Sequence, residues 1–215
     1  MPHPPVTDVD PILSSAADLI IAGGYDAVTF DAIAERCGVS AEEVQSLFDT
    51  PNDVLVSMLN REFSRMYAGI VDHVERDPRG GLLSRMYTYI LSSVYERPLA
   101  RTLFVIDRDA LHEIMRNANG FLYLPNIGVR ADLIENLQKA GMVRPDVDAR
   151  MVSSVLSVCS AGLAITAPHD DLDTTIRAIA DLLHRSVDAD VADTSQGKSA
   201  FYAWATSLTL PKTTA

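Results

Sequence analysis

Residues 25 to 48, YDAVTFDAIAERCGVSAEEVQSLF, contain two short helical patterns on either side of a glycine. Thr29 is expected to cap the first helix, because its hydroxyl can accept a hydrogen bond from a backbone N–H of the first turn. Gly38 supplies a tight turn after that helix. Ser40 and Glu43 have the spacing of a capping box, which begins the second helix. The stretch therefore predicts a helix-turn-helix unit.

The same helical periodicity extends over most of the chain, and no alternating strand pattern of useful length occurs. We therefore predict an all-α fold. Three N-terminal helices form a domain over 1–50, and a long helix joins it to a helical domain over 51–190. A polar tail over 191–215 includes FYAWATSL, which is apolar enough to dock. The expected helices cover residues 11–22, 30–37, 41–47, 51–75, 82–95, 99–115 (in one piece or two), 129–140, 146–166 and 172–187.

The acidic residues are concentrated at the N-terminus. The chain has 215 residues, 47% of them hydrophobic, and a net charge of −11. Between Met1 and Asn60 there is one basic residue, Arg36, against ten acidic ones, so this segment carries −9. Proteins that bind DNA normally neutralise phosphates with Lys and Arg. An acidic balance also argues against binding to anionic membranes and against non-specific binding to nucleic acid.

The sequence lacks several motifs that would indicate other functions. The two cysteines, Cys37 and Cys159, have neither disulfide-framework nor metal-ligand spacing. The opening MPHPPVTDVD lacks the features of a signal peptide, and no apolar run approaches transmembrane length, so we expect a cytoplasmic protein without a membrane partner. HEIMR at 112–116 is not the zinc motif HExxH, and no nucleophile elbow or phosphate-binding glycine loop occurs. We expect no enzyme activity, no metal and no cofactor.

Two stretches resemble the tetracycline-repressor (TetR) family of bacterial regulators. The first is ILSSAADLIIAGGYDAVTFDAIAERCGVS at 12–40, followed by Phe48 and by Val54 and Leu55. The second, LQKAGMVRPDVDARMVSSVLSVCSAGLAI at 137–165, resembles the last segments of the family's ligand-binding domain. The resemblance implies a homodimer that regulates transcription, with repression expected. An operator-binding N-terminal domain would respond to a small apolar ligand bound in the C-terminal domain.

The resemblance also suggests which residues face DNA, although the family's usual phosphate contacts are missing. Gln45 occupies the position of a phosphate-binding Tyr, and Pro51 or Asn52 that of a Lys. Helix N-termini can bind phosphate without formal charge, and Gln45 can pair with an adenine edge. An alternative for Glu43 is that it only caps its own helix. The candidate DNA-binding residues are Thr29, Ser40, Ala41, Glu42, Gln45, Ser46, Thr50 and Asn52.

Methionine and aromatic residues at helical spacing in the second domain are candidates for a ligand cavity, which the family resemblance implies. At any one of these positions a plain core role is the alternative. The candidate ligand-binding residues are Met66, Met86, Tyr89, Phe104, His112, Met115, Phe121 and Tyr123.

The helices expected over 146–166 and 172–187 are candidates for the dimer interface. The first has small residues that allow close helix approach, and its alternative is an intramolecular core helix. These small residues are Ser153, Ser157, Ser160, Ala161 and Ala164.

The acidity of the N-terminal domain leaves a second function open. A TetR-like module that has lost DNA binding could bind a small molecule, or present its acidic domain to a basic protein partner.

Overall fold

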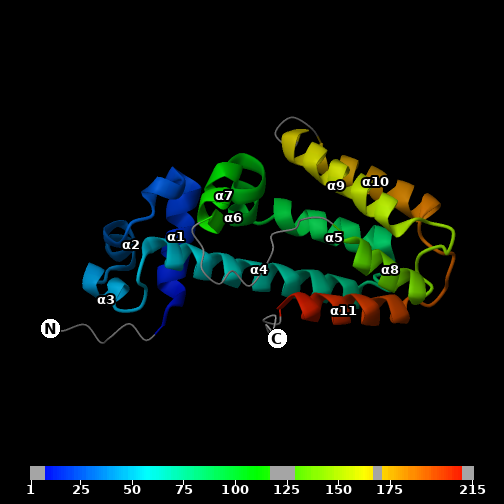
Figure 1. Cartoon of the computed structure of the whole chain (residues 1–215), viewed down its shortest axis with the longest axis horizontal. Helices are drawn as coiled ribbons and strands as arrows, with labels where there is room; N and C mark the ends of the chain where they lie inside the picture. The colour runs from blue at the N-terminus through cyan, green and yellow to red at the C-terminus, as the bar shows by residue number, and fades with distance from the viewer. Residues whose placement is uncertain (1–7, 117–128, 167–170, 210–215) are drawn as a thin grey trace. The chain divides into compact units, whose positions relative to one another are not determined.

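The structure is a computed structural model that describes residues 8–116, 129–166 and 171–209 (Figure 1). Within these ranges the elements are helices, with one isolated β-bridge between Val143 and Asp188 and no strand, so the predicted all-α fold is confirmed. The chain divides into two compact units. Unit 1 comprises 1–64 and 97–122, and unit 2 comprises 65–96 and 123–215.

Unit 1 holds the helix-turn-helix, and its capping follows the sequence prediction. The Thr29 hydroxyl accepts from the Ala32 N–H at 3.2 Å. Ser40 and Glu43 form the reciprocal capping box. Gly38 ends its helix with φ of 70°, in the left-handed region that favours glycine. The elements are α1 (Asp10–Gly23), η1 (Tyr25–Ala27), α2 (Phe30–Cys37), α3 (Ala41–Gln45), the start of α4 (Pro51–Arg76), α6 (Pro98–Arg101), η2 (Thr102–Ile106) and α7 (Arg108–Arg116).

Helix α3 is shorter than the sequence predicted, since it ends at Gln45. Leu47, which helical periodicity would turn inward, is exposed because the helix no longer continues at that position. The core of the helix-turn-helix is instead closed by fully buried aliphatic side chains. These are Ile12, Ile20, Ile33, Val44, Val54 and Leu55.

The helix predicted over 99–115 is broken into α6, η2 and α7. Residues 102–106 form a π-helical turn. Within it, Phe104 packs on Phe63 with ring centroids 5.9 Å apart. The Asp107 carboxylate then accepts from the Ala110 N–H at 3.0 Å and begins α7. A π-turn shifts the helical register by one residue, which accounts for the division of this helical stretch into pieces.

Unit 2 contains the remaining helices, and its C-terminal tail is helical and docked. Phe201 and Trp204 are buried, and the Trp204 indole N–H donates to Asp132 of α8 at 3.2 Å. The sequence indicated only that this segment was apolar enough to dock. The elements are the end of α4, α5 (Leu83–Tyr95), α8 (Ala131–Lys139), α9 (Ala149–Thr166), α10 (Leu172–Ser186) and α11 (Ser195–Thr209).

A buried carboxylate ties α5 to the end of α10. Asp188 accepts from the Ser84 N–H at 3.3 Å and from the Ser84 hydroxyl at 2.5 Å, and His184 lies 3.3 Å away. Nearby, Gly81 lies so close to the backbone of Thr194 that a Cβ at Gly81 would be 2.0 Å from the Thr194 carbonyl oxygen. Glycine is therefore required where the turn before α5 meets the start of α11.

Helix α9 presents an apolar stripe that the rest of the described chain leaves exposed. The exposed large side chains are Met151, Val155, Val158 and Ile165, with Leu182 exposed on α10. The helix has a mean hydropathy of 1.4 over 18 residues, and only 22% of it is buried. By length and composition it could cross a membrane, so the prediction that no apolar run approaches this length was wrong.

The small residues of α9 do not all lie on that exposed stripe. The Ser153 hydroxyl donates to the Val129 carbonyl at 2.8 Å, and Ser160 lies 3.1 Å from the Tyr87 hydroxyl. Both serines therefore face their own unit. Ser157 and Ala161 are exposed, and Ala164 is half-buried. The exposed stripe is mainly one of larger apolar side chains.

Candidate nucleic-acid interface and ligand residues

Helix α3 carries the polar side chains that the sequence assigned to DNA contact. Glu42 and Gln45 are exposed, while Ala41 is half-buried. The hydroxyl of Ser46 donates to the Glu43 carbonyl at 2.7 Å, which leaves its oxygen lone pairs to accept. Gln45 is thus the candidate in α3 whose side chain can both donate and accept.

Two of the helix N-termini expected to receive phosphates are closed by carboxylates of their own first turn. Glu43 accepts from the Ser40 N–H at 2.8 Å, so the interpretation that Glu43 caps its own helix is confirmed. At the start of α4, Asp53 accepts from both the N–H and the hydroxyl of Thr50, at 2.8 and 2.7 Å. Each carboxylate offsets the partial positive charge of the helix end. These ends are therefore weaker phosphate sites than bare helix termini.

Sequence reasoning missed Asp53, although its signal was present. Asp53 follows Thr50 at the same spacing at which Glu43 follows Ser40, with an aspartate in place of the glutamate. The shorter side chain still reaches back to the cap residue, as the two bonds to Thr50 show.

The basic residues of the first 64 positions are both held in ion pairs. Within the described part of this segment, 8–64, Arg36 lies 3.2 Å from Asp18 and Arg61 lies 3.0 Å from Asp10. Arg61 also donates to the Ser14 hydroxyl at 3.2 Å. A phosphate would have to compete with these carboxylates for either guanidinium group. Within the described part of this segment, both arginines are therefore engaged by carboxylates, and the acidity seen in the sequence persists in the folded domain.

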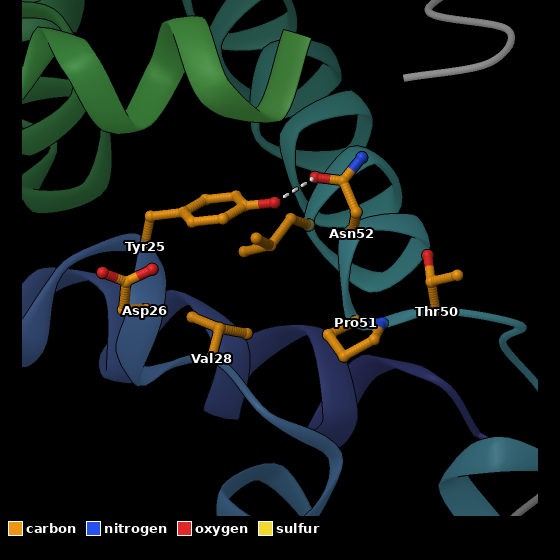
Figure 2. A pocket seen from close by; sticks show the side chains of 7 residues that line it. Tyr25, Asp26, Val28, Thr50, Pro51 and Asn52 are labelled. Atoms are coloured by element: carbon orange, nitrogen blue, oxygen red, sulfur yellow. Dashed lines mark hydrogen bonds between the residues drawn. The ribbon is translucent and has the colours of Figure 1, made fainter. Parts of the chain in front are cut away.

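The amide of Asn52 is used inside unit 1. Its oxygen accepts from the Tyr25 hydroxyl at 3.3 Å, as Figure 2 shows, and its nitrogen donates to the Ile114 carbonyl at 3.4 Å. One side chain thereby links η1, α4 and α7. These bonds use one of the two N–H donors and one of the two oxygen lone pairs of the Asn52 amide, and they fix its orientation within unit 1.

The ligand candidates are distributed over both units. In unit 1, Phe104 is buried against Phe63, Met115 is half-buried and His112 is exposed. In unit 2, Met66 and Met86 are buried. Two candidates, Phe121 and Tyr123, lie outside the described residues.

The sixth described candidate, Tyr89, belongs to a polar cluster rather than an apolar wall. Its hydroxyl donates to Asp77 at 2.6 Å, and Arg85 donates to the same oxygen at 2.6 Å. His73 stacks on the ring with centroids 5.4 Å apart. Burial raises the pKa of Asp77, but hydrogen bonds from Tyr89, the Arg79 backbone and Arg85 outweigh it, and the pKa lies below its usual value.

Asp77→Asn is expected to lower the free energy of unfolding by about 1–2 kcal/mol near neutral pH, because it removes a charge-assisted pair of bonds. The pKa of Asp77 in the folded state lies below 3.8, so its contribution is complete above that pH and is lost as pH falls through the folded-state pKa. Urea unfolding at neutral and strongly acidic pH measures the difference between the two proteins. A difference that stays equally large in acid would contradict this origin.

Among the described residues there is no group of three or more His, Cys, Asp or Glu side chains able to hold a metal ion.

Comparison with known proteins identifies the N-terminal domain. The family model for "Bacterial regulatory proteins, tetR family" matches residues 12–48, which run from α1 to beyond α3. The members of this family regulate transcription and are not enzymes. No curated protein sequence matches the chain significantly.

Solved structures of similar fold cover most of the chain. The fatty acid degradation regulator FadR from Bacillus halodurans has 17% identity and a TM-score of 0.57, over 84% of this chain and 96% of that one. SmeT, the repressor of the Stenotrophomonas maltophilia efflux pump SmeDEF, has 16% identity and a TM-score of 0.58, over 87% and 93%. FadR from Bacillus subtilis, solved with stearoyl-CoA, has 16% identity and a TM-score of 0.55, over 82% of this chain and 97% of that one. At these identities the likeness is one of fold.

Proposed function

We propose that this chain, whose residues 12–48 match the family model of the TetR bacterial regulatory proteins, is a ligand-responsive regulator of transcription that binds operator DNA as a homodimer. Repression is the proposed direction of control. The observation that carries the proposal is the matched helix-turn-helix, whose α3 exposes Gln45 beside Ser46. Gln45 can form the paired hydrogen bonds that distinguish adenine in the major groove.

Hydroxyl and backbone donors carry the phosphate contacts in this proposal. Thr29 and Ser40 accept backbone hydrogen bonds as caps, which leaves each hydroxyl proton able to reach a phosphate oxygen. Thr50 already donates its proton to Asp53, so it contributes less. Binding would pair few Lys or Arg side chains with phosphates, and few counterions would be released from the DNA. The affinity should therefore depend weakly on salt.

The test is a titration of DNA flanking the protein's own gene, with random competitor DNA, over a series of salt concentrations. We expect a saturable, competitor-resistant complex whose log K falls with log salt at a slope shallower than about −3, because each neutralised phosphate contributes about −0.9. Glu42→Lys should tighten binding and steepen the slope by about 0.9. Glu135→Lys, the same charge change at an exposed position of α8 in unit 2, is the matched control.

A steep slope in the unmodified protein would contradict the assignment of phosphate contacts to neutral groups. Absence of any complex at low salt, from protein that is folded and dimeric, would instead favour the second candidate. This is a TetR-like module that has lost DNA binding. The carboxylates of Glu43 and Asp53 at two helix starts, with Glu42 exposed on α3, are the observations that favour it.

Dimerisation is proposed through α9 and α10. The stripe of Met151, Val155, Val158 and Ile165, with Leu182 on α10, is an apolar surface of a kind that monomeric proteins rarely leave in water. A two-fold symmetric contact would cover the same stripe on both copies. Two helices from each copy would then form a four-helix interface.

The proposed effector is a small apolar molecule. The buried methionines Met66 and Met86 of unit 2 offer adaptable apolar surface of the type that lines such sites. The fold shared with a regulator that was solved with stearoyl-CoA is consistent with an apolar effector. Regulation requires that the effector bind one conformation of the dimer more tightly than the other.

A further inference from the structure

A cavity of about 450 Å³ lies within unit 1, between η1 and the first turn of α4 (Figure 2). This volume falls within the range of about 300–1,000 Å³ that is usual for small-molecule sites. Its lining residues are Tyr25, Asp26, Val28, Thr50, Pro51, Asn52 and Leu55. None of them is among the candidates for the C-terminal ligand site.

The cavity combines an apolar floor with one available charge. Val28 and Leu55 are buried and contribute aliphatic surface. The polar groups of Tyr25 and Asn52 bond to one another. Asp26 is exposed on η1, and among the described residues its carboxylate has no hydrogen bond or ion pair. The ring of Tyr25, with Asp26 beside it in Figure 2, forms one wall.

We propose that this cavity binds a small organic cation, an ammonium group attached to an apolar body. The carboxylate of Asp26 and the face of the Tyr25 ring both favour a positive charge. Val28 and Leu55 suit the apolar body. The charge of −9 over the first 60 residues attracts cations to this domain and repels anions. The proposal does not depend on whether the domain binds DNA.

Asn52 connects the cavity wall to α7 by hydrogen bonds, so binding in the cavity can affect other parts of unit 1. Its amide bonds both Tyr25 in the cavity wall and the Ile114 carbonyl of α7. A cation that reorients the Tyr25 ring would alter the bond on one side of Asn52 while the bond on the other side holds α7. The site could therefore influence the position of α7 relative to α4 inside the unit.

The test uses the full-length protein with benzylammonium as the probe and benzyl alcohol as its neutral analogue. Methyl NMR would follow Val28 and Leu55, which line the cavity, and Val44, which is buried in α3 away from it. We expect saturable shifts at Val28 and Leu55 with benzylammonium, with Val44 unchanged. Equal affinity for benzyl alcohol, or no shift at either cavity methyl, would overturn the proposal.

Two variants separate a specific contact from general attraction. Asp26→Asn should weaken benzylammonium binding by about threefold to fivefold, the upper part of the range expected when a solvent-exposed ion pair is lost. Asp31→Asn removes the same charge from an exposed position on α2 outside the lining, and should change the affinity by less than about twofold. Equal weakening by both substitutions would show that only the overall charge of the domain matters, and would refute the site.

Discussion

Val158→Asp is expected to convert the proposed dimer into a monomer that no longer binds operator DNA. Val158 is 73% exposed in the single chain and lies in the middle of the apolar stripe of α9. In a two-fold interface each copy would bury one unpaired carboxylate, and an uncompensated buried charge costs about 3–5 kcal/mol. The dimer dissociation constant should therefore rise by more than about a hundredfold, since 1.4 kcal/mol corresponds to tenfold.

Light scattering during gel filtration over a range of protein concentrations measures this change. Tyr202→Asp is the matched control, because Tyr202 is 58% exposed on α11 of the same unit but lies outside the proposed interface. That variant should stay dimeric. Helical circular dichroism should be unchanged in both variants, since each substitution lies on an exposed helix face. A Val158→Asp protein that remains dimeric would remove α9 from the interface.

Phe201→Ala is expected to lower the free energy of unfolding by about 3–5 kcal/mol, the usual cost of truncating a buried aromatic side chain. Phe201 is 1% exposed, and its ring lies 5.9 Å from that of Trp204. The substitution leaves a cavity under α11 and removes the aromatic ring that packs against Trp204. Urea unfolding, followed by helical circular dichroism and by fluorescence of the single tryptophan, gives the magnitude.

The neighbouring Tyr202 supplies the control for this prediction as well. Tyr202→Ala changes the same helix at an exposed position and should alter stability by no more than about 0.5 kcal/mol. If Phe201→Ala were equally mild, α11 would be a loosely attached tail. If tryptophan fluorescence changed at a lower urea concentration than circular dichroism, α11 would detach before the rest of unit 2 unfolds.

Local sequence rules predicted the helix-turn-helix well because its signals act over three or four residues. Thr29, Gly38 and the Ser40–Glu43 pair each satisfy or redirect backbone groups in the adjacent turn, whatever lies further away. The same rule, applied to Thr50 and Asp53, would have shown that the start of α4 is already capped. That omission concerned a residue of the candidate site, and the sequence contained the information.

Other features of the candidate sites depend on residues far apart in the chain. Asn52 was selected as a phosphate contact from its place after a helix start, but its amide bonds Tyr25 and the backbone of Ile114. Tyr89 was selected as an apolar wall, but Asp77 and Arg85 engage its hydroxyl. No local pattern reports such partners.

By itself, the sequence determined the all-α class, the capped helix-turn-helix and the acidity of the first 60 residues, since these follow from periodicity, short-range hydrogen bonds and composition. Tertiary structure alone decided that Arg36 and Arg61 are paired with carboxylates and that the apolar stripe of α9 stays exposed. It also decided that α11 docks through Phe201. Burial and ion pairing join residues distant in the chain, and their energies depend on which surfaces meet once the helices have packed.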